Sequence, residues 1–396
     1  MLSEQRLKYL TDLCAELVRI KSCSGEEKQV IGYLENLFKK SGCPDILIDE
    51  YGSLTARFAG KRAGNTILFD SHVDTVPVTD QDAWASEPFG GKITDNRIYG
   101  RGTADMKGAL AAVIVAVQSY LEDHGNDFPG QIVISAGVHE ESFEGIASRR
   151  ISRRVNPDIV VICEATNLNL ARGQRGRAEI VMETFGKPAH SSNPQAGINA
   201  VYNMMNLLNA VRSLRVSEHP VLGRGILELT DIKSSPYPGL SVVPACCRCT
   251  FDRRLLVNET EGTVLQPIRT LIDELQAGNP DFKARAVYAE GTETCYTGEM
   301  ISARRFFPGW LYDETESFIR SALTGLQSAG LDPDITTYSF CTNGSHYAGE
   351  AGIKTIGFGP SAEQQAHIND EYIEIYQLQQ ACRGYYGMLA PLLSDA

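Results

Sequence analysis

The stretch Thr66-Ile-Leu-Phe-Asp-Ser-His-Val-Asp74 decides the fold, because it joins an apolar run to a polar cluster that follows it directly. Two later stretches repeat this arrangement: residues 131–135 precede His139-Glu-Glu141, and residues 158–163 precede Glu164. Runs with so few polar interruptions are typical of strands that are buried on both faces of a sheet. The sequence therefore predicts several buried strands, each followed by acidic or histidine side chains.

Helical patterns alternate with these strands. An apolar run at residues 46–48 precedes the first of them, and a helical pattern at residues 107–121 lies between the runs at 66–69 and 131–135. This order predicts an α/β domain whose parallel or mixed sheet is covered by helices on both faces. In doubly wound sheets, binding sites form at the carboxyl ends of the strands. We therefore expect the polar clusters to meet at one edge of the sheet.

The pattern changes near Gly173, which indicates a second domain. Segments 178–184 and 246–252 alternate as half-buried strands do, and helical patterns lie at 198–214 and 262–277. These predict a small α+β domain at residues 175–290, inserted into an α/β domain made of residues 1–174 and 291–396. The closing part returns to helix, strand, strand and helix, at 314–329, 336–340, 354–358 and 377–393.

Two helices are expected before the first strand. Ser24 and Glu27 have the spacing of a capping box and precede the apolar residues Val30, Leu34 and Leu37. We therefore expect Ser24 to cap the second helix.

The composition excludes some classes of partner. The chain has 396 residues and a formal net charge of −12, which argues against nucleic acid. The longest apolar run, residues 109–117, is too short to cross a membrane. The first residues lack the pattern of a signal peptide, and the ten cysteines then read as reduced thiols. We expect a cytoplasmic protein that binds neither nucleic acid nor membrane.

Several residues have the chemistry of metal ligands. Taken singly, each has a structural explanation: His72 with Asp74 as a hydrogen-bonded pair, Asp105 as a helix cap, and Glu164 as a strand end. Together with Glu140, Glu141 and His367 they place imidazoles and carboxylates at predicted strand ends. Mixed ligation of this kind suits zinc, manganese or cobalt better than magnesium or calcium.

The adjacent acids Glu140 and Glu141 can divide two tasks. If Glu141 binds a metal, Glu140 is placed to take a proton from water. Two metals about 3.5–4 Å apart would also need a bridging carboxylate.

In this order the motifs resemble the co-catalytic metallopeptidases that include acetylornithine deacetylase, succinyl-diaminopimelate desuccinylase, aminoacylase and carboxypeptidase G. The resemblance covers residues from about 10 to 390. It rests on Ser71-His-Val-Asp-Thr-Val-Pro77, Gly100-Arg-Gly-Thr-Ala-Asp-Met-Lys-Gly108, Glu140-Glu141, Glu164, Gly186-Lys-Pro-Ala-His-Ser191 and His367.

The resemblance implies a role for each ligand. Asp105 would bridge two divalent ions, with a cis peptide bond after it. One ion would be completed by His72 and Glu164, and the other by Glu141 and His367. Zinc is the expected metal, and manganese and cobalt are alternatives.

The same resemblance implies further roles. Glu140 would be the general base and then the acid, and Asp74 would support His72. The inserted domain would be a lid that also forms a homodimer. Its His190 would stabilise the oxyanion in the partner subunit's site.

Further motifs resemble a narrower branch of hydrolases linked to selenium metabolism. They are Arg172-Gly-Gln-Arg-Gly-Arg177, Asp252-Arg-Arg254, Phe306-Phe-Pro-Gly-Trp310 and Thr342-Asn-Gly344. We expect Arg254, Asn343 and Gly344 to bind substrate, Arg254 through a substrate carboxylate. A structural salt bridge is the alternative for Arg254. Desuccinylases have Asn where this chain has Ser241, which argues against succinyl specificity.

These observations predict a metal-dependent hydrolase of a small amide, either an N-acyl amino acid or a dipeptide, whose substrate carries a carboxylate. Three alternatives remain. A lid-less aminopeptidase relative fits poorly, because residues 175–290 read as an inserted domain. The same metals could support cleavage of another C–N bond, such as that of a carbamoyl or aryl amine. The chain could also be a non-catalytic binding protein on this fold, although every expected ligand position is filled.

Overall fold

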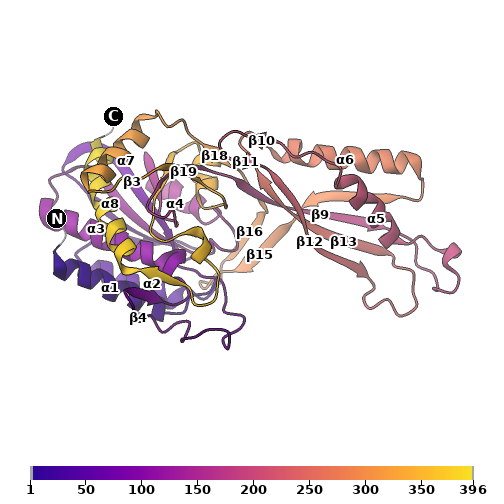
Figure 1. The fold of residues 1–396 in the computed structure, drawn as a ribbon, viewed down its shortest axis with the longest axis horizontal. Helices are drawn as coiled ribbons and strands as arrows, with labels where there is room; N and C mark the ends of the chain where they lie inside the picture. Colours follow the sequence, from indigo (N-terminus) through magenta and orange to yellow (C-terminus); the bar gives the residue numbers. More distant parts are fainter. Residues whose placement is uncertain (1–2, 395–396) are drawn as a thin grey trace. The chain divides into compact units, whose positions relative to one another are not determined.

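The structure, a computed structural model, describes residues 3–394 and divides the chain into two compact units (Figure 1). The larger unit contains the described residues up to Gln174, Thr292–Ser302, and those from Trp310 onward. The smaller unit consists of Arg175–Gly291 and Ala303–Gly309. The sequence-based boundary at residue 290 leaves out this second piece. It belongs to the smaller unit because strand β17, Phe306–Phe307, pairs with strand β9.

A mixed sheet of nine strands forms the centre of the larger unit within the described residues. Its strands are β1 (Asp45–Ile48), β2 (Leu54–Ala59), β6 (Pro129–Gly137), β3 (Arg62–His72), β7 (Ile159–Ile162), β20 (Lys354–Gly357), β8 (Leu170–Gln174) and β18 (Trp310–Leu311), in spatial order, with β19 (Ile335–Tyr338) also paired to β8. The four neighbours β6, β3, β7 and β20 run parallel to one another. Their carboxyl ends therefore lie at the same edge of the sheet.

Alternation along these strands explains why helices cover both faces of the sheet. Phe69 and its alternate neighbours pack in a core with helices α1 (Glu4–Arg19), α2 (Lys28–Lys40), α3 (Gly108–His124), α7 (Ser317–Ser328) and α8 (Ile375–Ser394). Leu68 belongs to a second core, with helix α4 (Ser148–Val155) and the π-helical segment η3 (Ser345–Glu350). Adjacent strand residues point to opposite faces. The α/β fold class predicted from the sequence is confirmed.

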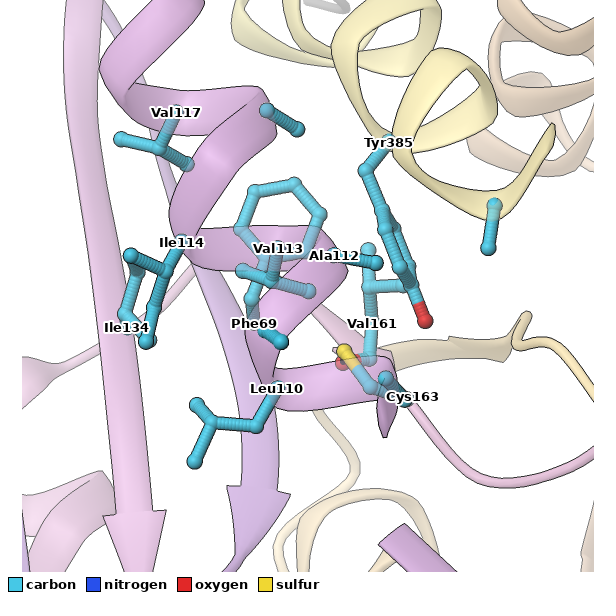
Figure 2. Close-up of a cluster of buried hydrophobic side chains, with 14 of the residues drawn as sticks. Phe69, Leu110, Ala112, Val113, Ile114, Val117, Ile134, Val161, Cys163 and Tyr385 are labelled. Carbon is cyan, nitrogen blue, oxygen red and sulfur yellow. Dashed lines mark hydrogen bonds between the residues drawn. The ribbon is translucent and has the colours of Figure 1, made fainter. Parts of the chain in front are cut away.

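Helix α3 is the most apolar helix of the larger unit. Figure 2 shows its Leu110, Val113 and Ile114 beside Phe69 and Ile134 of the sheet, with Tyr385 of α8 nearby. By length and composition, the segment Thr103–His124 could cross a membrane, but 83% of its most apolar window is buried inside the protein. Burial of this kind is what a core helix shows.

The predicted capping box at α2 is wrong. The residue before α2 is Glu27, whose side chain makes no cap hydrogen bond. The Ser24 hydroxyl instead donates to Asp74 (2.8 Å), and Glu27 accepts from the Gly25 backbone N–H (2.9 Å). Both side chains are used by longer-range or loop contacts, so the helix begins without a side-chain cap.

The smaller unit is an antiparallel sheet packed against two helices. Its strand order is β12 (Ile226–Ser235), β13 (Cys246–Leu255), β9 (Gly176–Phe185) and β14 (Lys283–Tyr288), with β17 also paired to β9. The helices are α5 (Ala200–Val211) and α6 (Glu261–Gly278). Cys247 and Cys249 of β13 pack in the core beside Met204 and Leu207 of α5, so these thiols serve as apolar filling.

The remaining elements are short. They are β4 (Lys92–Thr94), β5 (Arg97–Tyr99), β21 (Tyr372–Glu374), β10 (Glu218–His219), β11 (Gly223–Arg224), β15 (Glu290–Thr294), β16 (Met300–Arg304), and the helical turns η1 (Thr103–Lys107), η2 (Pro194–Ala196) and η4 (Glu363–Gln365). Strand β5 of the small sheet β21-β5-β4 shortly precedes η1, which carries Asp105.

Candidate metal centre

The parallel strands of the larger unit bring four of the expected ligands to one edge of the sheet. Strand β3 ends at His72, which is in register with Gly137 at the end of β6. Glu140 and Glu141 follow β6, and Glu164 follows β7. His367 lies in the segment after β20, and Asp105 lies in η1 before α3. Residues from five separate parts of the chain therefore converge.

Asp105 lies between the two imidazoles. Its Oδ1 is 3.0 Å from Nε2 of His72, and its Oδ2 is 3.1 Å from Nε2 of His367. Each imidazole also meets a second carboxylate: Glu164 lies 3.2 Å from His72, and Glu141 lies 3.0 Å from His367. Two donor sets thus share Asp105 through its two different oxygens.

The spacing of these donors fits metal ions. Atoms bound to one zinc ion at about 2.0–2.1 Å in tetrahedral geometry lie about 3.3 Å from one another. Two groups with ligand atoms within 4.8 Å of one another occur among the described residues: His72, Glu140 and Glu164, and His72, Asp105 and Glu141. The Asp105–Met106 peptide bond is cis, as the resemblance implies.

Asp74 supports both His72 and the two adjacent acids. Its backbone carbonyl lies 2.9 Å from Nδ1 of His72, which leaves Nε2 directed at Asp105 and Glu164. Its carboxylate accepts the backbone N–H groups of Glu140 and Glu141, each at 3.1 Å. Contacts of this kind fix the orientation of a metal-binding imidazole and of the loop beside it. Ser24, whose spacing from Glu27 predicts a helix cap, instead adds a third hydrogen bond to this carboxylate.

The site holds more negative than positive charge. Among the described residues, the ion pairs of Asp105, Glu140, Glu141 and Glu164 are all with histidine. Burial raises the pKa of the Glu140 carboxyl well above its usual value, and burial next to Asp105 raises that of Glu141 to about 7. Hydrogen bonds to Asp105 and Glu141 raise the pKa of His367 to about 10. Divalent cations would compensate this excess of buried carboxylate, so the residues present fit a pair of such ions.

The residues expected to bind substrate are differently placed. Asn343 is buried, and both ends of its amide are used: it donates to Asp70 (2.9 Å) and accepts from the Gly145 N–H (2.7 Å). These contacts give Asn343 a structural role, and its predicted contact with substrate stays a prediction. The N–H of Gly344 donates to the Thr342 hydroxyl (3.0 Å).

The other two residues belong to the smaller unit. Arg254 on β13 forms an ion pair with Asp252 (2.8 Å), which is the contact that the alternative of a structural salt bridge predicts. His190 is exposed, and its Nδ1 lies 2.7 Å from the Ser192 hydroxyl. The expected roles of both residues stay predictions.

Comparison with known proteins agrees with this architecture. Residues 68–390 match peptidase family M20/M25/M40. The chain is 30% identical over 370 residues to the uncharacterized protein YgeY of Escherichia coli K12, covering 91% of this chain and 89% of that protein. It is 25% identical over 406 residues to succinyl-diaminopimelate desuccinylase 2 of Ruegeria sp. TM1040, covering 98% and 96%.

The fold is also found among solved structures. The YXEP protein of Bacillus subtilis, a dinuclear metal binding peptidase from the M20 family, superimposes with a TM-score of 0.74 at 13% identity, over the full length of both chains. The family match, the relatives and the converging ligands all point to hydrolysis of small amide bonds with the help of metal ions. The chain therefore belongs to peptidase family M20/M25/M40 and is a metallohydrolase that acts on amide bonds.

Proposed function

We propose that this protein hydrolyses N-acyl amino acids or dipeptides with two divalent ions, zinc in the native enzyme. His72, Asp105 and Glu164 would hold one ion, and Asp105, Glu141 and His367 the other. The observation that carries this proposal is the position of Asp105, whose Oδ1 and Oδ2 face different imidazoles at 3.0 and 3.1 Å. A carboxylate shared in this way is what a two-metal site requires.

When bound, the ions would supply an acidified water and polarise the amide carbonyl. Glu140 is the residue that moves the proton. Its carboxylate is buried, and its backbone N–H is held by Asp74. Its Oε2 lies 3.9 Å from Nε2 of His72, farther than the Glu164 oxygen at 3.2 Å. Glu140 would take a proton from the attacking water, hold it in a site shielded from solvent, and deliver it to the leaving nitrogen.

The smaller unit would complete the enzyme as a lid and a dimerisation domain. Within the described residues, β12 is an edge strand, and it exposes Ile226, Leu229 and Ile232. Edge strands with exposed apolar side chains favour pairing with another chain. In a homodimer, His190 of the partner subunit would donate to the oxyanion, and Arg254 would bind the substrate carboxylate. Light scattering tests this assembly, and a monodisperse monomer would contradict it.

The small substrates and the expected reduced cysteines suit a cytoplasmic enzyme. Within the described residues none of the ten cysteines forms a disulfide, and seven of them are buried. A metal-dependent deacylase of this kind would act on metabolites carrying a free carboxylate. Fractionation of the native host, followed by immunodetection, tests the compartment.

The deciding experiment measures amine release from a panel of N-acyl amino acids, dipeptides and N-carbamoyl compounds. Chelated protein is compared with the same protein reloaded with zinc, manganese or cobalt. We expect metal-restored turnover of an acyl amino acid or a dipeptide. Turnover of only a carbamoyl or aryl amine would replace the proposed substrate class. No turnover despite two bound equivalents of metal would favour a non-catalytic binding role.

A further inference from the structure

Glu371 is a buried carboxylate that the proposed chemistry does not use. It is 0% exposed, lies four residues after His367 and immediately precedes β21. Arg101, itself 4% exposed, contacts its Oε2 at 2.6 Å. A buried charge needs a partner, and the ion pair with Arg101 would already meet that need. The remaining contacts of Glu371 go beyond this ion pair.

The carboxylate of Glu371 collects backbone N–H groups from the turn that carries Asp105. Its Oε1 accepts from Ala104 (2.8 Å) and from Asp105 itself (3.2 Å), and its Oε2 accepts from Gly102 (3.1 Å). Charge-assisted bonds of this kind are stronger than neutral ones. Three N–H groups of one turn are thereby fixed around a single side chain.

The backbone of Glu371 is fixed to the same turn. Its carbonyl accepts the N–H of Gly100 (2.8 Å), and Tyr372 of β21 pairs with Tyr99 of β5. The turn needs such support because its backbone departs from helical geometry: Gly102 has a φ of 87°, and Asp105 lies at φ −131° and ψ 92°. The segment from His367 to Glu371 thus connects one expected ligand, His367, to the side chain that supports another, Asp105.

We propose that Glu371 is a positioning residue, which sets the orientation of Asp105 toward His72 and His367 through the backbone of residues 102–105. The inference rests on the proposed function, because it assumes that Asp105 binds metal. Glu371 itself touches no reacting atom. Loss of its contacts would rotate or loosen Asp105, and both donor sets share that residue.

The test compares Glu371→Gln with Glu374→Gln. Glu374 lies three residues further along, on β21, and its 45% exposed side chain pairs with Arg97 at 3.4 Å, so it controls for loss of a carboxylate in the same segment. Gln at 371 can still accept, but its amide group would face backbone N–H groups. We expect Glu371→Gln to bind cobalt(II) ten- to a hundred-fold more weakly, as loss of outer contacts to metal ligands commonly does.

The readouts are cobalt(II) stoichiometry and affinity by competition with a chelator, the visible absorption spectrum of the cobalt protein, and kcat against KM. We expect a changed spectrum and a loss mainly in kcat, with Glu374→Gln unchanged. A folded Glu371→Gln protein with the wild-type spectrum, affinity and kcat would overturn the proposal.

A second pair of variants covers the case in which Glu371→Gln does not fold. Glu371→Asp keeps the charge opposite Arg101 but is one methylene shorter, and Glu374→Asp is its control. We expect Glu371→Asp to weaken cobalt binding while Glu374→Asp does not, and equal affinities would overturn the proposal. Wild-type protein that binds fewer than two equivalents would instead refute the proposed two-metal function.

Discussion

Substitution of Glu140 by Gln tests whether this residue carries a proton or binds a metal ion. The change removes a charge and a proton acceptor but preserves the shape of the side chain. Glu140 is buried, and its backbone is held by the Asp74 carboxylate at 3.1 Å. A glutamine should therefore occupy the same place without disturbing the ligands.

The expected magnitude follows from the role. Glu140 lies 3.9 Å from Nε2 of His72, whereas Glu164 lies at 3.2 Å, and the proposal therefore makes Glu164 the ligand and leaves Glu140 to exchange a proton. General acid–base groups contribute about 10²- to 10⁴-fold to the rate. The loss in kcat should thus be about 2.7–5.4 kcal/mol of transition-state stabilisation, at about 1.36 kcal/mol per tenfold.

The assay measures metal content and kcat on the same zinc-loaded samples. Glu140→Gln should retain two zinc ions and lose turnover, whereas Glu141→Gln should lose zinc as well. Glu26→Gln, at a 57% exposed position, is the control and should change neither quantity. A Glu140→Gln protein that binds only one zinc would identify Glu140 as a ligand, in the group that joins it to His72 and Glu164. Near-normal turnover with two zinc ions would refute the assignment of the base.

Four further substitutions test the metal-site support, the packing and the pH dependence of the fold. Asp74→Asn removes a charge that holds two backbone N–H groups, so zinc affinity in chelator competition should fall about 10- to 100-fold. Gly344→Ala would place a Cβ 2.6 Å from the Trp310 indole nitrogen and should destabilise the fold in urea unfolding by about 1–3 kcal/mol. Gly32→Ala, in α2 with nothing within 4 Å, should stabilise it by up to about 1 kcal/mol. Burial opposes ionisation of Glu350, but its hydrogen bonds to histidine and arginine lower its pKa from 4.5 to about 2. Its stabilising effect is therefore present above pH 4.5, and the difference in unfolding free energy between wild type and Glu350→Gln should shrink as pH falls toward 2.

The expected ligands could be found from the sequence because each follows a recognisable strand or opens a recognisable helix. His72 and Glu164 end apolar runs whose period and composition predict strands buried in a parallel sheet. Parallel order then places their carboxyl ends at one edge. The same reasoning cannot locate Arg254 or Asn343, because their partners, Asp252 and Asp70, come from packing that no local pattern encodes.

Ser24 and Glu27 show where local reasoning fails. Their spacing matches a capping box, but the cap competes with Asp74 and with the backbone of residues 25 and 139. Hydrogen bonds that are buried or involve a charge stabilise the fold more than exposed ones do. The bonds to Asp74 and to the loop beside the site are therefore stronger than those that a cap on an exposed helix end would provide. Tertiary contacts at a functional site therefore outweighed the local signal.

The residues that support the expected metal centre are all buried carboxylates. This explains why no sequence pattern identifies them and why the centre would need cations. Asp74, Glu27 and Glu371 are buried carboxylates that accept backbone N–H groups of the loops carrying Glu140, Glu141 and Asp105. Because a backbone N–H belongs to every residue but proline, such partners leave no mark in the sequence. Each support also adds an acidic group close to the expected ligands, and among the described residues only that of Glu371 forms an ion pair with an arginine. The rigid loops are thus obtained at an electrostatic cost that divalent ions would relieve, so metal binding and the stability of this edge of the sheet should be coupled.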